Sequence, residues 1–205
     1  MNHQIVALFQ EAAEANYACK LRQGNIVNLP LEGSDVVSGD LHGHSRNFDR
    51  IRAFADLEEN PGRHGICQEI IHGGPEDESG GCLSFELLCD VLGYMLEYPE
   101  QVHIVMGNHD TAVINDHDVL KNGKEMNHAM KQAMRRRFCG HYENAIDAMR
   151  YYLLSQPLEV RTANRIWMSH SLPANKFASS FDVSVFAKKL EPDDMLRPNS
   201  AYLLT

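Results

Sequence analysis

A short apolar stretch is followed at once by residues that could bind a metal ion. The sequence VVSGDLHGH, residues 36–44, places one carboxylate and two imidazoles among glycines. Asp40 and His42 are two positions apart, so both side chains can project to the same side of an extended chain. A carboxylate beside an imidazole suits a borderline divalent cation such as Mn, Fe or Zn. The stretch therefore predicts a metal-binding strand end, where the glycines let the backbone turn sharply.

Other predicted strand ends carry residues of the same types. Asn108 and His109 follow one apolar run, and His170 follows another. His72 also ends a run, where a side chain facing a metal is expected, so it is a further candidate ligand. Asp-Leu-His alone could be a capped turn, and His170 alone could be a core histidine. The set taken together favours a metal site over these simpler interpretations.

The residues above lie in a sequence in which predicted strands alternate with predicted helices. This alternation predicts an α/β fold, in which functional groups lie in loops beyond the strand ends. Helices are expected at 4–22, from a capping Ser45 to about residue 60, at 84–96, and over most of 111–155 with a break near 139–140. Strands are expected at 25–29, 35–38, 66–71 and 102–106, followed by a hairpin formed by 158–161 and 165–169.

Composition excludes several classes of protein. The 205 residues carry a formal net charge of -9 with a pI near 5.6, which argues against general affinity for nucleic acid or anionic membranes. The one basic run, residues 135–137, is expected to be a solvated helix face. No apolar run approaches membrane-spanning length. Five cysteines without a CxxC pair indicate a reducing compartment, so we expect a cytoplasmic protein.

Two motifs resemble a known family. GDLHGH and GNHD, separated by a helix, a strand and another helix, resemble the GDxHG and GNH(D/E) segments of the calcineurin-like metallophosphoesterases. YPEQVHIVMGNHD is most similar to the serine/threonine protein phosphatase branch, and SHSLP lies where that branch has its HGG segment. The resemblance covers roughly residues 34–173. It implies a calcineurin-like phosphoesterase fold, with β-sheets flanked by helices and metal-binding loops at strand ends.

The resemblance also implies roles for individual residues. Asp40 and His42 would bind the first of two divalent cations (Mn, Fe or Zn), and Asn108 and His170 the second. His109 would be the general acid that protonates the leaving oxygen. Such a dinuclear site uses a metal-bound hydroxide as nucleophile. The implied reaction is hydrolysis of a phosphate monoester on a phosphorylated substrate, by a phosphatase that requires metal, with manganese among the candidates.

The chain departs from this family in two places. The GDxxDRG segment has no obvious counterpart in IIHGGPEDESGGCLSFELL. Counting back from Ser84 puts Glu76 in the place of the metal-bridging aspartate, whereas alignment from the strand end points to His72 or the glycines after it. The family also supplies a later metal-binding histidine, and no histidine follows His170. We therefore expect residues 1–205 to form a single metallophosphoesterase-like domain that lacks its C-terminal part.

Two other functions remain open at this point. A non-catalytic metal-binding or regulatory protein of the same fold is favoured by the altered second segment and opposed by the intact Asn108-His109 pair. A nuclease of the same superfamily is disfavoured by the acidic balance and by the lack of a basic groove.

Overall fold

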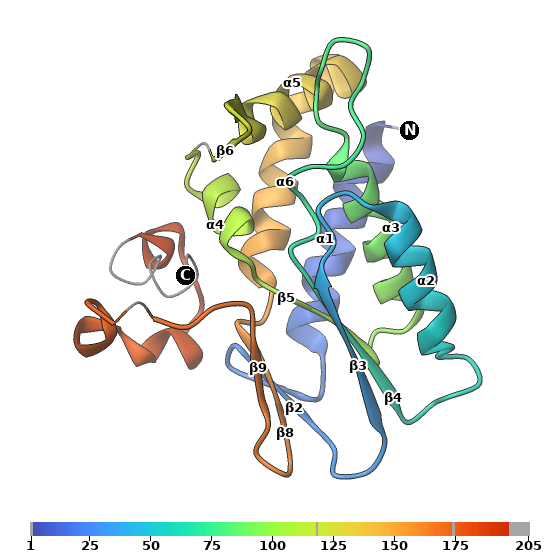
Figure 1. The fold of residues 1–205 in the computed structure, drawn as a ribbon, viewed down its shortest axis with the longest axis vertical. Helices are drawn as coiled ribbons and strands as arrows, with labels where there is room; N and C mark the ends of the chain where they lie inside the picture. Colours follow the sequence, from blue (N-terminus) through green and yellow to red (C-terminus); the bar gives the residue numbers. More distant parts are fainter. Residues whose placement is uncertain (1, 118, 174, 197–205) are drawn as a thin grey trace.

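The computed structural model describes residues 2–117, 119–173 and 175–196. Strands and helices alternate through much of this region, as the sequence predicted (Figure 1). Within the described residues, no helix is both long enough and apolar enough to cross a membrane.

Six α-helices are present in the described residues, together with four short 3-10 helices. The α-helices are α1 (Asn2–Ala18), α2 (Ser45–Ala55), α3 (Ser84–Glu97), α4 (Asn108–Ile114), α5 (Met126–Phe138) and α6 (Tyr142–Ser155). The 3-10 helices are η1 (Cys139–His141), η2 (Ala178–Ser180), η3 (Val183–Phe186) and η4 (Pro192–Met195).

The strands form three sheets. They are β1 (Arg22–Gln23), β2 (Ile26–Leu29), β3 (Ser34–Asp40), β4 (Arg63–Gln68), β5 (Val102–Val105), β6 (Leu120–Lys121), β7 (Lys124–Glu125), β8 (Glu159–Thr162) and β9 (Trp167–Ser169). The order β3-β4-β5 is fully parallel, so the carboxyl ends of these strands lie at one edge. A second sheet has the order β1-β2-β8-β9, and β6 pairs with β7 in a separate hairpin.

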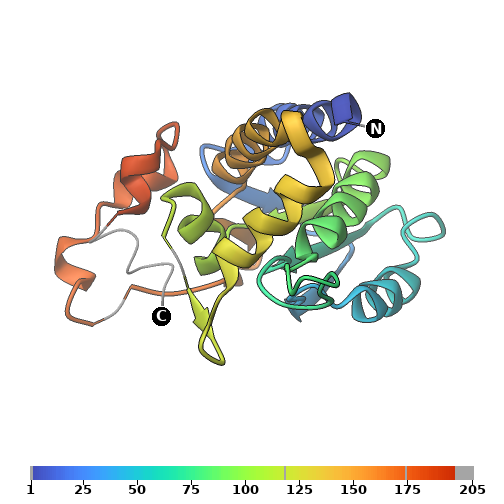
Figure 2. The ribbon, with the colours of Figure 1, turned by 90° about the horizontal axis from the view of Figure 1, so that it is seen from above.

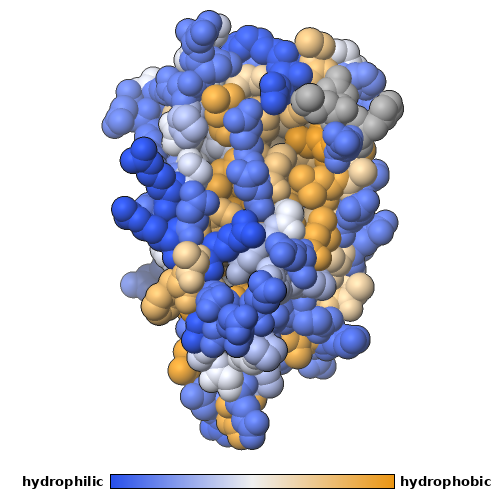
Figure 3. Space-filling model, turned by 90° about the vertical axis from the view of Figure 1, so that its right-hand side faces the viewer, coloured by the Kyte–Doolittle hydropathy of each residue, from blue (hydrophilic) through white to orange (hydrophobic). Residues whose placement is uncertain are grey.

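Apolar side chains join these layers. The parallel sheet and the second sheet share a small buried cluster made of Val27, Leu29, Ile66, Val105 and Val160. The main core lies among the helices, where α1 packs against both α3 and α6. Figure 2 shows these helices from above, with the β6–β7 hairpin projecting beside them. Polar side chains cover much of the face in Figure 3, with apolar patches between them.

Several boundaries differ from the prediction. The first helix ends at Ala18, not at Arg22, because Arg22 pairs in β1 and its guanidinium donates to the carbonyl oxygens of Asn16 and Ser155. Ser45 is the first residue of α2 and not its cap, since His44 takes the cap position.

Two further differences bear on the candidate site. The strand predicted at 66–71 begins at Arg63 and ends at Gln68, and Glu69 adopts a positive φ of 46°. The region after Thr111 is interrupted by the β6–β7 hairpin, which turns at Asn122 and Gly123, both with positive φ. This conformation is typical of two-residue hairpin turns. The predicted break near 139–140 is present as η1, and the predicted hairpin is formed by β8 and β9.

Candidate metal centre

The ends of three parallel strands and the end of β9 bring the candidate residues together. Asp40 is the last residue of β3, and His42 follows it two positions later. Asn108 and His109 open α4, directly after β5 and the Met106-Gly107 turn. His170 follows β9, which pairs antiparallel with β8. Beyond the carboxyl ends of parallel strands is where α/β folds place their ligand sites.

His170 lies at the centre of the group. Its Nε2 is 2.8 Å from Asn108 Oδ1 and 3.0 Å from Glu69 Oε2. Its Nδ1 is 3.1 Å from Gln68 Oε1 and 3.9 Å from Asp40 Oδ1. Two ring nitrogens thus face four oxygens, which come from the ends of β3 and β4 and from α4.

Glu69 supplies a carboxylate that the sequence analysis did not identify. Its side chain is 1% exposed, its Oε1 accepts a hydrogen bond from the His109 backbone N–H at 3.2 Å, and its Oε2 faces His170. The expectation of a strand through residue 71 had placed Glu69 inside a buried run. A lone carboxylate within the apolar sequence GICQEIIHGG was the available signal, because a buried charge is costly unless it is paired.

Glu76, the other carboxylate considered for this place, lies in the loop after the strand. Its Oε1 accepts a hydrogen bond from Lys124 Nζ of β7 at 2.6 Å. The side chain of Glu76 is 47% exposed, in contrast to that of Glu69. The buried carboxylate that contacts His170 is therefore Glu69.

Three imidazoles lie together beside these oxygens. His42 Nε2 is 3.4 Å from Asp40 Oδ2, so the two residues are neighbours as the sequence predicted, although His42 has a positive φ of 44° and is not extended. The rings of His72 and His109 are stacked, with centroids 3.4 Å apart, and the centroid of His42 is 5.5 Å from that of His109. The tentative ligand His72 therefore lies flat against the proposed general acid.

Glycines allow the loops of this site to approach each other. A Cβ atom added to Gly43 would lie 2.5 Å from the carbonyl oxygen of Gly73, and one added to Gly74 would lie 2.6 Å from the carbonyl oxygen of Gly43. All three glycines also have positive φ. The backbone contact between the β3 and β4 loops thus requires the absence of side chains at these positions.

The local charges shift the pKa values of two histidines in opposite directions. Burial, together with the neighbouring His72, His42 and Lys121, lowers the pKa of His109 to about 3. Burial would also lower the pKa of His170, but its hydrogen bond to Glu69 and the nearby carboxylate charges raise it. Without a bound cation, His109 is therefore neutral near pH 7, whereas the carboxylates stabilise the protonated form of His170.

By donor type, these residues suit a borderline divalent cation: two carboxylates, one amide oxygen and two imidazoles stand next to one another. Across the described residues, however, no three His, Cys, Asp or Glu side chains are arranged so that they could hold a metal ion. The donors contact one another through His170. A histidine ligand must present an unprotonated ring nitrogen, so protonation of His170 would compete with metal binding there.

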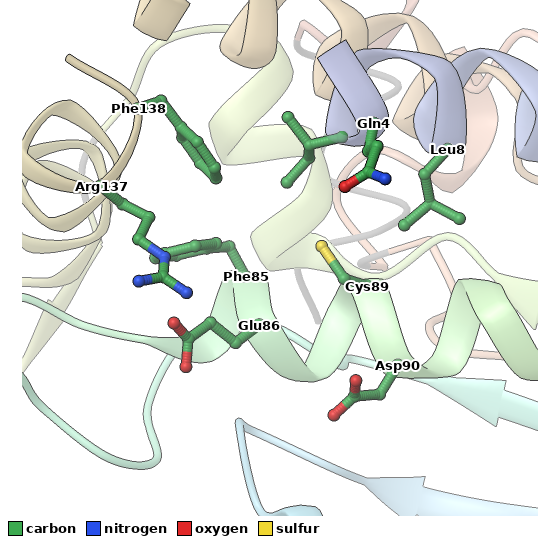
Figure 4. A pocket seen from close by; sticks show the side chains of 9 residues that line it. Gln4, Leu8, Phe85, Glu86, Cys89, Asp90, Arg137 and Phe138 are labelled. Carbon is green, nitrogen blue, oxygen red and sulfur yellow. The ribbon is translucent and has the colours of Figure 1, made fainter. Parts of the chain in front are cut away.

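A separate pocket of about 320 Å³ lies between α1, α3 and α5 (Figure 4). Its lining is mainly apolar, with Ile5, Leu8 and Phe85 among the residues that form it. Burial raises the pKa of the Cys89 thiol in this pocket to about 12, which leaves no thiolate for nucleophilic chemistry. The pocket contains no imidazole, so it does not compete with the strand-end group as a metal centre.

The fold matches that of a solved phosphatase. A structure described as a protein serine/threonine phosphatase from Saccharomyces cerevisiae, with similarity to human phosphatase PP5, matches this chain with a TM-score of 0.65 at 14% sequence identity. The match covers 99% of this chain and 58% of that one, so this chain spans less than two thirds of the yeast structure. No family model matches the sequence. The α/β calcineurin-like phosphoesterase fold predicted from the sequence is confirmed.

Proposed function

We propose that this protein is a metal-dependent phosphoesterase that hydrolyses a phosphate monoester. The observation that carries the proposal is the convergence of Asp40, Glu69, Asn108 and His170 at one sheet edge, next to His109, on a phosphatase fold. A protein phosphatase is the specific form that the fold match favours. The match covers 58% of the yeast structure, so protein phosphatase activity is proposed here for a chain that corresponds to part of that structure.

In the proposed reaction, Asp40, His42, Glu69, Asn108 and His170 would hold two divalent cations. When bound, such cations polarise the phosphoryl group and activate a water molecule for attack. Glu69 also accepts the backbone N–H of His109, which ties the proposed acid to the ligand group. The carboxylate thus has a positioning role in addition to that of a ligand.

His109 would donate a proton to the leaving oxygen. Its Nδ1 is buried and has no hydrogen-bond partner among the described residues, which leaves a polar atom for a ligand to satisfy. A neutral imidazole cannot act as an acid, but the negative charge of a bound phosphate favours the protonated form. Substrate binding would therefore supply part of the shift that the acid requires.

The test combines metal analysis with hydrolysis of a generic aryl phosphate in added manganese. We expect about two metals per chain, as in two-metal phosphatases. His109→Gln should lower kcat about 10²–10⁴-fold, the range typical of general acid catalysis, and should retain the metal. His128→Gln, which changes an exposed histidine on α5, is the matched control. Equal activity of wild type and His109→Gln would contradict the proposal.

A second candidate is a non-catalytic protein that binds metal or phosphate on the same fold. It is favoured by the altered second segment, IIHGGPEDESGG, in which the arginine of GDxxDRG has no obvious counterpart. Bound metal without hydrolysis that depends on His109 would select this function over the enzyme.

A further inference from the structure

The β6–β7 hairpin brings a lysine to the edge of the candidate site. Lys121 Nζ donates a hydrogen bond of 3.4 Å to the carbonyl oxygen of His72. A Cβ atom added to Gly73 would lie 3.0 Å from the same Nζ. The ammonium therefore lies next to the space that a side chain at position 73 would enter, and it contacts the backbone of His72, whose ring is stacked on that of His109.

Lys121 brings a positive charge near the imidazoles. Its Nζ lies by the backbone of His72, whose ring is stacked on that of His109. An ammonium at this place suits an anionic ligand, because a charged donor makes the stronger hydrogen bonds to phosphate oxygens. A phosphate monoester carries up to two negative charges and would meet the ammonium and the rings together.

Neighbouring lysines are engaged in ion pairs, and Lys121 differs from them. Lys124 pairs with Glu76 at 2.6 Å, and Lys131 pairs with Asp116. Within the described ranges, Lys121 has no carboxylate within ion-pair distance, and it is only partly exposed. A partly buried ammonium without a counter-ion carries a desolvation cost, which an anion bound at this place would offset.

The hairpin also gives the lysine a defined position. Asn122 and Gly123 have φ values of 53° and 79°, the conformation of a tight hairpin turn, and Lys121 pairs with Lys124 across it. The carbonyl oxygen of His72 then orients the ammonium from the side of the β4 loop. Lys121 thus approaches the site from an element separate from the strand ends that carry the ligands.

We propose that Lys121 binds the phosphoryl oxygens of the substrate through its ammonium, in the space beside Gly73. The inference rests on the proposed function for its substrate, a phosphate monoester. It adds a phosphate-binding cation that the metal ligands and His109 do not provide.

The test compares Lys121→Met, Lys121→Arg and Lys124→Met, with inorganic phosphate as the probe in the presence of manganese. Phosphate binding is measured by calorimetry and, where hydrolysis occurs, KM and kcat are measured with an aryl phosphate. Lys121→Met should weaken phosphate binding and raise KM about 10-fold or more, as expected for loss of a charge-assisted hydrogen bond. Lys121→Arg should recover most of the affinity, and Lys124→Met should change it less than about 2-fold.

The outcomes separate this inference from the proposed function. Hydrolysis with an unchanged KM in Lys121→Met overturns the role of Lys121 alone. Phosphate binding that depends on Lys121, without any hydrolysis, supports the binding role and contradicts the enzyme. Equal losses of phosphate affinity in Lys121→Met and Lys124→Met would assign the effect to the hairpin as a whole. Retained phosphate binding in Lys121→Met would assign binding to other groups. Either result would overturn the inference. Bound manganese, measured in each variant, must match wild type for a loss of affinity to count as support.

Discussion

Two groups of histidines lie at opposite ends of the parallel sheet, and they have very different surroundings. At the carboxyl ends of the strands, His170 contacts Asp40 and Glu69, and His42 contacts Asp40. Near the amino ends of β4 and β5, His64 and His103 are stacked on each other, with ring centroids 5.5 Å apart. His64 Nδ1 is 3.3 Å from His103 Nε2, so these two imidazoles are partners of each other.

The comparison shows which feature distinguishes a candidate site from a buried pair. Each group contains a buried histidine and stacked rings, with His72 at the carboxyl ends and His64 and His103 near the amino ends, so neither burial nor clustering alone separates them. Carboxylate contact does: burial lowers the pKa values of both His64 and His103, whereas Glu69 and Asp40 raise that of His170. Imidazoles beside carboxylates offer a mixed ligand set that suits a borderline divalent cation, and in the described residues no carboxylate contacts the His64–His103 pair.

Removing the buried carboxylate is the strongest way to break this comparison. Glu69→Gln keeps the size of the side chain and removes its charge, so one bridge between His170 and His109 is lost. We expect metal affinity and hydrolysis to fall about 100-fold or more, since even residues outside the ligand shell typically contribute 10–100-fold. Metal content and kcat/KM of the purified variant measure this effect.

His103→Leu is the matched variant at the other end of the sheet. It removes one histidine of the buried pair and should leave metal content and activity within about 2-fold of wild type, since no ligand is touched. A comparable loss of activity in both variants would show that the two histidine groups are not functionally distinct.

The sequence was sufficient to predict the elements that carry Asp40, Asn108 and His170. Strand alternation and the glycines after Asp40 and before Asn108 placed these residues at strand ends, and the structure brings both into contact with His170. The prediction used local signals only, because apolar runs and glycines report where a strand stops.

Features that depend on tertiary contacts were not predictable in the same way. Glu69 was missed because β4 ends at Gln68, and its end is set by the pairing with β3 and β5 and not by composition. The β6–β7 hairpin lies within residues 111–155, for which the sequence predicts mostly helix, since two-residue strands leave almost no periodic pattern. Lys121 therefore could not be assigned to the site from its neighbours in the sequence.

A substitution at Gly107 tests the position of the Glu69 carboxylate without altering the chemistry of that side chain. Gly107 has φ of -102°, which alanine can adopt, but an added Cβ atom would lie 2.4 Å from Glu69 Oε1. Gly107→Ala should displace the carboxylate and lower activity about 10–100-fold, because small misplacements near reacting groups are costly. Stability should fall by about 1–3 kcal/mol, the usual cost of overpacking, as measured by urea unfolding.

Gly93→Ala provides the control for this substitution. Gly93 lies within α3, and an added Cβ atom there would meet no atom within 4 Å. The variant should keep full activity and gain about 0.5–1 kcal/mol of stability, because alanine is favoured over glycine in a helix. If Gly107→Ala behaved like Gly93→Ala, the position of the Glu69 carboxylate would not matter for function.

The pH dependence of stability tests the buried pair directly. Burial, followed by the charge of His64, lowers the pKa of His103 from 6.5 to about 3. Between these values the unfolded chain binds a proton that the folded chain does not, so stability falls as the pH decreases through this window. We expect His103→Leu to reduce the loss of unfolding free energy between pH 7 and pH 5 by about 1–2 kcal/mol.

Urea unfolding at the two pH values measures this difference, with His128→Ala, at an exposed position, as the control. An unchanged pH dependence in His103→Leu would mean that the pair takes up protons in the folded state, and that the two ends of the sheet are more alike than their contacts indicate.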